Sequence, residues 1–98
     1  MNIIISNGSE KPIYEQIASQ LKNMVLSGEL KEGALLPSIR LLAKELRISA
    51  ITTKRAYSEL EQDGFIETVA GKGSFVSGRN QELMKEEVLR VIEEALQQ

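Results

Sequence analysis

The chain has 98 residues, 42% of them hydrophobic but only 4% aromatic, which fits one small domain with a mainly aliphatic core. It contains no cysteine and no histidine, so disulfides, cysteine zinc sites, thiol nucleophiles and histidine-based catalysis are excluded. We therefore expect no catalytic residues, no metal and no cofactor. The longest apolar runs are too short to span a bilayer, and residues 1–11 lack the features of a secretory signal, so no membrane association and a cytoplasmic location are expected.

The net charge of −2 is unevenly distributed along the chain. Residues 38–58 are net +4, whereas the stretches before and after them are net negative. The basic side chains of this stretch are Arg40, Lys44, Arg47, Lys54 and Arg55. A charge run of this kind is usually a solvated helix face, and a surface for nucleic acid is the alternative interpretation.

The first third of the chain predicts an arm, a helix and a connector. Residues 1–11 are mostly polar and indicate a loose or strand-like arm. Pro12 suits the first turn of a helix, because its missing N–H would be unpaired there. The helix that follows has a single apolar stripe and is expected to stop at Gly28. Residues 29–37 predict a connector with a short strand at 34–36.

Two helices joined by a very short turn are predicted next. Ser38 and Ser49 are both good N-caps, so one helix is expected from Ser38 to about Arg47 and another from Ser49 to about Asp63. Gly64 is expected to end the second of them. Such a crossed pair is a helix-turn-helix unit.

A hairpin and a last helix complete the prediction. Residues 65–69 and 74–77 are β-prone, and residues 70–73 form a glycine-containing turn of suitable length between them. Residues 81–97 are amphipathic and predict a helix. A helix-turn-helix followed directly by a hairpin makes a winged helix.

This arrangement favours DNA binding, because a helix fits the major groove while the preceding helix braces it against the backbone. The beginning of the helix that follows Ser49 would face base edges. Small residues at Ser49 and Ala50 allow close approach, and Thr52 can hydrogen-bond a phosphate or base. Arg55 can bind guanine in a bidentate manner, which Lys54 cannot match.

The sequence resembles the winged-helix DNA-binding domain of GntR-type bacterial transcription regulators, in particular their small YtrA-like branch. The resemblance covers about residues 12–78 and rests on seven blocks in the same order: Pro12-Ile13-Tyr14-Glu15-Gln16-Ile17, Gly28-Glu29-Leu30, Leu36-Pro37-Ser38-Ile39-Arg40-Leu41-Leu42-Ala43, Leu46-Arg47-Ile48-Ser49, Arg55-Ala56-Tyr57-Ser58-Glu59-Leu60-Glu61, Asp63-Gly64-Phe65-Ile66 and Gly71-Lys72-Gly73-Ser74-Phe75-Val76. It implies a mainly α fold with a small β-hairpin. The expected domains are an N-terminal arm (1–11), a winged helix-turn-helix domain (12–78) and a C-terminal helical dimerisation tail (79–98).

The resemblance also implies roles for individual residues. Arg40 matches a position that contacts the DNA backbone or a base, and Ser38 and Ser49 match helix starts that meet phosphates. The matching readout segment holds Thr52, Lys54 and Arg55, and the matching wing tip, which enters the minor groove, holds Gly71, Lys72 and Gly73.

Two features of the third helix depart from the family pattern. Ala50 and Ile51 stand where relatives often carry polar residues, which suggests apolar readout against a thymine methyl group. Thr53 stands where the family usually has Val, and we expect it to be buried with its hydroxyl bonded to a preceding carbonyl.

The predicted function is a sequence-specific transcription regulator, in particular a dimeric repressor that binds a double-stranded operator with an inverted repeat. The alternative is a winged-helix module that binds protein and not DNA. For residues 79–98 the alternative to a dimer interface is a helix folded back on its own domain. The sequence does not identify a small-molecule effector.

Several motifs also have less specific interpretations. Residues 71–74 lack the full phosphate-loop pattern, and the glutamates of residues 86–94 fit a solvated helix face better than a metal site. Tyr57 is expected to be a packing residue. Arg40 could instead form an ion pair with Glu45 or Glu59.

Overall fold

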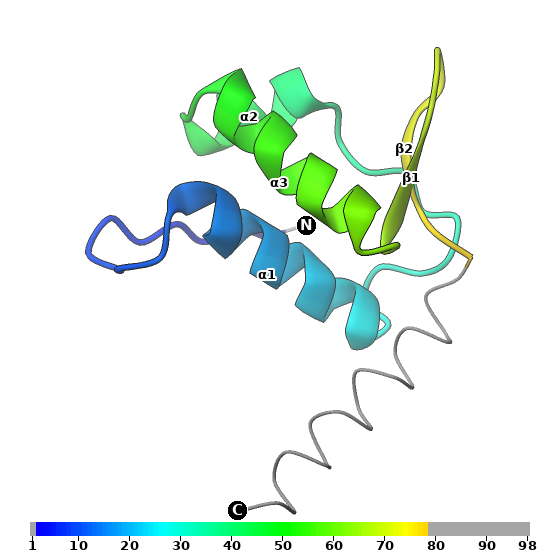
Figure 1. Ribbon diagram of the computed structural model, residues 1–98, viewed down its shortest axis with the longest axis horizontal. Coiled ribbons are helices and arrows are strands. Elements are labelled where there is room, and N and C mark those ends of the chain that lie inside the picture. The colour runs from blue at the N-terminus through cyan, green and yellow to red at the C-terminus, as the bar shows by residue number, and fades with distance from the viewer. Residues whose placement is uncertain (1, 79–98) are drawn as a thin grey trace, which may run out of the picture.

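The computed structural model describes residues 2–78 as three helices followed by a two-stranded antiparallel hairpin (Figure 1). The elements are α1 (Ile13–Leu26), α2 (Ile39–Leu46), α3 (Ala50–Gln62), β1 (Ile66–Val69) and β2 (Gly73–Val76). This order confirms the predicted winged helix. The helix expected over residues 81–97, and with it the proposed dimerisation tail, lies outside the described residues. Within residues 2–78 no helix is long and apolar enough to cross a membrane.

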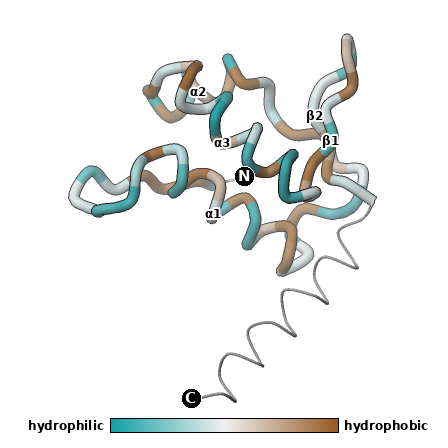
Figure 2. The backbone as a smooth tube through the Cα atoms, viewed as in Figure 1, coloured by the Kyte–Doolittle hydropathy of each residue, from teal (hydrophilic) through white to brown (hydrophobic). Residues whose placement is uncertain are grey.

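One core joins all five elements. Helices α1 and α2 both pack against α3, and strand β1, which follows α3 in the chain, packs against it as well. The fully buried side chains include Ile17, Leu21, Leu42 and Leu60, which come from all three helices. Hydrophobic and hydrophilic residues alternate along the helices in Figure 2, as expected for helices with one buried side. Helix α3 is therefore held by neighbours on both flanks while its outer face stays open.

The helix ends follow the predicted signals with one shift. Pro12 is the N-cap of α1 (φ −57°, ψ 152°) and so precedes the first turn instead of belonging to it. Its carbonyl accepts hydrogen bonds from the N–H groups of Glu15 and Gln16, both at 3.1 Å. Gly28 and Gly64 follow the ends of α1 and α3 with φ of 83° and 81°, a left-handed conformation that suits glycine.

The N-terminal arm is held on α1 by two glutamine side chains. The Gln20 amide donates to the Ile4 carbonyl (2.6 Å) and accepts from the Ile4 N–H (2.9 Å). Gln16 forms the same pair of bonds with Ser6 at 2.9 and 3.1 Å. Each amide thus pairs with the arm as a neighbouring strand would. The expected loose or strand-like arm is an extended segment fastened to a helix.

The hairpin is shifted slightly from its predicted strands. The register pairs Ile66 with Val76 and Val69 with Gly73. Phe65 stays outside β1 because its N–H bonds back to the Leu60 carbonyl of α3 at 2.9 Å. The strand predicted at residues 34–36 is reduced to an isolated bridge between Leu35 and Phe75. This bridge ties the connector to β2 and fixes the base of the hairpin.

Candidate nucleic-acid interface

The start of α2 is capped by Ser38 and exposes Arg40, the second residue of the helix. The Ser38 hydroxyl accepts a hydrogen bond from the Leu41 N–H at 3.1 Å, which confirms the predicted N-cap. Arg40 is exposed. Among residues 2–78 the only ion pair joins Lys22 to Asp63, so Arg40 does not pair with Glu45 or Glu59. Its guanidinium is available to a partner outside the described domain.

The turn between α2 and α3 places a cation in a strained backbone conformation. Arg47 is the C-cap of α2 with φ of 56° and ψ of 46°. It is the single non-glycine residue with positive φ in the described chain. The Ile48 N–H bonds to the Ala43 carbonyl at 3.0 Å and closes the helix end. A side chain in this conformation costs roughly 1–2 kcal/mol, so the turn keeps an exposed Arg47 at a cost in stability.

The start of α3 is held by a hydroxyl pair. The Ser49 hydroxyl accepts from the Thr52 N–H at 3.1 Å and lies 2.7 Å from the Thr52 hydroxyl. Thr53 is fully buried and its hydroxyl donates to the Ser49 carbonyl at 3.2 Å, as predicted from the sequence. These bonds fix the first turn, whose leading N–H groups point along the helix axis without intrahelical partners.

The outer face of α3 combines an apolar residue with two cations. Ala50, Lys54 and Arg55 are exposed, and Ile51 is 81% exposed, which is far more than a packing residue needs. Ile51 and Arg55 lie one turn apart on the same strip of the helix. The structure thus brings together four of the predicted readout residues, while Thr52 is half-buried beside them.

Arg55 touches an aromatic residue of the first helix. Its guanidinium carbon lies 3.9 Å from the centroid of the Tyr14 ring, and one Nη donates to the Tyr14 hydroxyl at 3.2 Å. Tyr14 belongs to the first turn of α1 and is only half-buried. No spacing rule indicates this contact, because the two residues are 41 positions apart.

The hairpin tip has the conformation predicted for a wing. Gly71 and Gly73 have φ of 78° and 116°, and the Lys72 N–H closes the turn on the Val69 carbonyl at 3.0 Å. Lys72 is exposed at the tip. Figure 1 shows the tip projecting beyond the helices on the side of the molecule where α2 and the first turns of α3 also lie.

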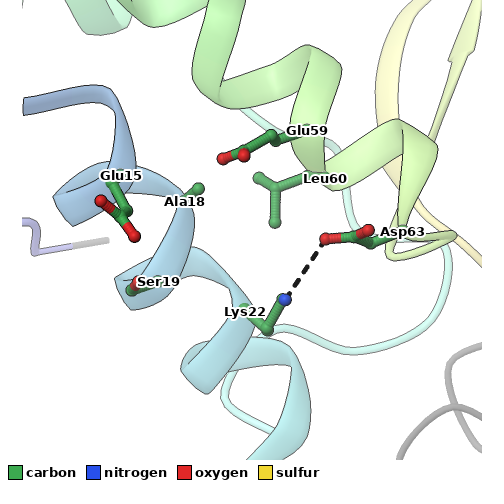
Figure 3. Close-up of a pocket in the computed structure, with 7 residues that line it drawn as sticks. All are labelled: Glu15, Ala18, Ser19, Lys22, Glu59, Leu60 and Asp63. Atoms are coloured by element: carbon green, nitrogen blue, oxygen red, sulfur yellow. Dashed lines mark hydrogen bonds and ion pairs between the residues drawn. The ribbon is translucent and has the colours of Figure 1, made fainter. Parts of the chain in front are cut away.

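Acidic side chains gather elsewhere, in a pocket between α1 and α3. This pocket of about 150 Å³ is lined by Glu15, Lys22, Glu59 and Asp63 among others (Figure 3). Lys22 reaches Asp63 at 3.3 Å and lies 5.1 Å from the Phe65 ring centroid. No group of three metal-ligating side chains occurs in the described part of the chain. Of the acids that line this pocket, Asp63 is the one paired with a cation within residues 2–78. The two acids of the last turn of α3 are Glu59, which faces α1, and Glu61, which bonds to Thr68 of β1.

Tyr57 supports the interface from below. It is buried, and its hydroxyl donates to the Pro37 carbonyl at 2.7 Å, which ties α3 to the residue before Ser38. Burial, together with the nearby Glu45 charge, raises the pKa of this hydroxyl above its ordinary range. Tyr57 is thus the packing residue that the sequence predicts.

Comparison with known proteins assigns the chain to a family. Residues 13–76 match the model of the bacterial regulatory proteins of the gntR family. The chain is 41% identical over 96 residues to the HTH-type transcriptional repressor YtrA of Bacillus subtilis, which covers 98% of this chain and 74% of that protein. It is 41% identical over 73 residues to the HTH-type transcriptional repressor NagR of the same organism, but spans only 30% of it.

Solved structures agree with the sequence comparison. YtrA from Sulfolobus acidocaldarius, a GntR-family transcription factor, superposes with a TM-score of 0.76 at 38% identity over 98% of each chain. A transcriptional regulator from Oenococcus oeni gives a TM-score of 0.83 at 30% identity, over 95% of this chain and 78% of that one. The relatives are regulators and not enzymes. The chain belongs to the GntR family of bacterial regulatory proteins and is a winged-helix, DNA-binding transcription regulator.

Proposed function

We propose that this regulator is a dimeric repressor that reads an inverted-repeat operator through the first turns of α3. The observation that carries the proposal is the outer face of α3, where Ile51 is 81% exposed beside the exposed Lys54 and Arg55. Ile51 is the most exposed of the large hydrophobic side chains in residues 2–78 and lies one turn before the two cations, and a major groove offers both methyl groups and acceptors to such a surface.

Each residue of the interface takes a role that fits its surroundings. Lys54 and Arg55 read base edges together with Ala50, Ile51 and Thr52, and Ile51 packs against a thymine methyl group. The capped helix starts at Ser38 and Ser49 lie against phosphates, since helix N-termini attract anions.

The two flanks of α3 hold it on the duplex. Arg40 of α2 contacts the DNA backbone or a base, because it is exposed and has no carboxylate partner in residues 2–78. At the other flank Gly71 and Gly73 let the backbone of the wing enter the minor groove beside Lys72. Contacts to phosphates position the protein, and contacts to bases supply its specificity.

Dimerisation through residues 79–98 is the second part of the proposal. An exposed apolar face of several hundred Å² is rare in monomers, and a two-fold partner is the simplest cover. In the helix predicted from the sequence, the apolar residues would be Leu83, Met84, Val88, Val91, Ile92 and Ala95. The same symmetry sets two recognition helices about 34 Å apart or a multiple of it, and therefore predicts an inverted repeat. Repression is proposed from the names of the relatives YtrA and NagR.

Selection of binding sites from random duplex DNA tests the proposal. We expect one enriched inverted repeat, and the logarithm of its binding constant should fall linearly with the logarithm of the salt concentration. A failure to enrich any sequence would favour a protein-binding module instead. Sedimentation equilibrium at micromolar concentration tests the dimer, and a mass equal to one chain at every concentration would contradict it.

Arg40→Ala tests the individual assignment. We expect operator affinity to fall by about 1–3 kcal/mol if Arg40 contacts a base, with little change in stability. Lys31→Ala is the matched control, because Lys31 is also an exposed cation, lies in the connector, and its replacement removes the same charge. Equal affinities of the two variants would contradict the role given to Arg40.

A further inference from the structure

The contact between Tyr14 and Arg55 links the first helix of the domain to the recognition surface. The guanidinium lies over the tyrosine ring at 3.9 Å and donates to its hydroxyl at 3.2 Å. Both the face and the hydroxyl of Tyr14 are therefore in contact with one cation. This is more than burial of a hydrophobic side chain requires, since Tyr14 stays half-buried and Arg55 stays exposed.

Tyr14 packs against the hydrophobic core. It follows Ile13 in the first turn of α1, and its helix neighbour Ile17 is completely buried. The same turn is anchored on the arm side by Gln16, whose amide donates to the Ser6 and Lys11 carbonyls at 3.1 and 2.9 Å. The ring is thus a fixed platform, while the side chain that it holds projects from the open face of α3.

The contact leaves Arg55 able to bind DNA. One of its five N–H groups is used by the Tyr14 hydroxyl, so that a two-point contact with a base remains possible. Its charge is not neutralised, because the single ion pair within residues 2–78 is between Lys22 and Asp63. A free arginine has many rotamers, and freezing them opposes binding. Stacking on the ring selects a few of these rotamers before DNA arrives.

We propose that Tyr14 is a positioning residue for base recognition: its ring holds the Arg55 guanidinium in a preorganised orientation on the recognition face. The proposal rests on the function inferred above and extends it to a residue of α1. Removal of the ring should weaken operator binding by between about 2-fold and 10-fold, the factor for immobilising one flexible side chain. It should also reduce discrimination at the operator position that Arg55 reads.

The experiment compares Tyr14→Leu, Tyr14→Phe, Arg55→Ala and the Tyr14→Leu/Arg55→Ala double variant of the full chain. Affinity is measured for the selected operator and for every single-base substitution of one half-site, at a temperature at which circular dichroism shows each variant folded. Tyr14→Leu should flatten the profile at the same position as Arg55→Ala. Tyr14→Phe should keep the wild-type profile because it keeps the ring. The double variant should bind no worse than Arg55→Ala alone.

Lys22→Ala is the matched control, because it removes the other contact between α1 and α3 that carries charge, at the opposite end of the helix pair. It should leave the base profile unchanged. The proposal is overturned if Tyr14→Leu lowers affinity equally at all positions, if its effect adds fully to that of Arg55→Ala, if it tightens binding, or if Tyr14→Phe loses the profile. A wild-type chain that selects no operator would instead contradict the proposed function itself.

Discussion

The two halves of α3 differ in a way that helix stability does not explain. The first half carries Lys54 and Arg55 and no acid, whereas the second half carries Glu59 and Glu61 and no base. The helix dipole favours the reverse arrangement, with acids near the N-terminus and bases near the C-terminus. The first turn of α3 has no acidic residue and the last turn has no basic one. The charges of this helix are therefore arranged against its own stability.

This difference indicates that the first half of α3 is adapted to binding DNA and the second half to packing within the domain. The cations in the second turn of α3 gain nothing from the helix dipole but suit a polyanion at that end. At the other end, Glu59 lies in the pocket beside α1, where Lys22 pairs with Asp63 just past the helix (Figure 3), and Glu61 accepts a hydrogen bond from the Thr68 hydroxyl of β1 at 2.8 Å. The exposed Ile51 and the strained Arg47 lie at the same end as the cations, so several local costs gather where DNA is proposed to bind.

Adding a negative charge to the first half gives the largest expected effect. Ile51→Glu places a carboxylate in the first turn, where the dipole favours it by about 0.3–1 kcal/mol. Operator affinity should fall by about 100-fold or more, because like charges facing each other across an interface cost several kcal/mol. Thermal melting and fluorescence anisotropy measure the two changes. Gln62→Glu adds the same charge at the last residue of α3, and it should neither raise the melting temperature nor weaken operator binding. If both variants lost the same binding affinity, the two halves of α3 would not differ in function.

Distorting the wing tests whether it belongs with the first half. Gly73 has φ of 116°, and a Cβ there would lie 3.2 Å from the Leu35 Cδ1 atom. Gly73→Val should therefore cost about 1–2 kcal/mol of stability and weaken operator binding, with helical content preserved. Gly8→Val is the control, since its Cβ would meet nothing within 4 Å. Unchanged binding by Gly73→Val would separate the wing from the interface.

Relieving the strain at the turn should raise stability and lower affinity together. Arg47→Gly removes both the charge and the penalty of a side chain at φ of 56°, and should stabilise the domain by about 1 kcal/mol. Arg47→Ala removes the charge but keeps the strain. Both variants lose the charge of the exposed Arg47, so they should bind the operator equally weakly. Only Arg47→Gly should melt at a higher temperature. If both bind like the wild type, the strain has no connection with DNA.

Substitution of Tyr57, which lies where the two halves of α3 meet, is expected to give the smallest of these effects. Loss of its hydroxyl in Tyr57→Phe leaves the Pro37 carbonyl without its 2.7 Å donor and should cost about 1 kcal/mol of stability. Its raised pKa means that the folded state keeps a proton that the unfolded state loses above about pH 10. Stability should consequently fall as the pH rises beyond that value, and less so in Tyr57→Phe.

Ultraviolet titration of Tyr14→Phe isolates this effect, because Tyr57 is then the only tyrosine of the chain. Its ionisation should coincide with unfolding followed by circular dichroism. If the Tyr57 hydroxyl ionised while the domain was still folded, burial would not be what raises its pKa.

The sequence predicted those parts of the site that depend on neighbours along the chain. Ser38 and Ser49 cap their helices, Thr53 bonds to the Ser49 carbonyl, and Gly71 and Gly73 have positive φ. Each of these features lies within a few residues and follows from backbone stereochemistry. The strand limits were wrong by about one residue, since the Phe65 N–H is used by the end of α3.

The features that the sequence did not predict depend on how distant segments meet. Periodicity predicted one apolar stripe on the first helix, but it does not indicate that the Tyr14 ring meets Arg55 of α3. It likewise did not show that Gln16 and Gln20 fasten the arm, or that residue 35 bridges to the hairpin. Such contacts require a crossing angle and a register between elements, which local pattern does not contain.

The sequence by itself thus determined the element order, the caps, the wing turn and the basic stretch, because each is encoded in short-range spacing. Only the tertiary structure decided which of the basic side chains are free and which are held. Arg40 has no carboxylate partner in the described domain, whereas Arg55 is stacked on Tyr14. The physical reason is that a long side chain chooses its rotamer from what the packing of α1 against α3 places within its reach.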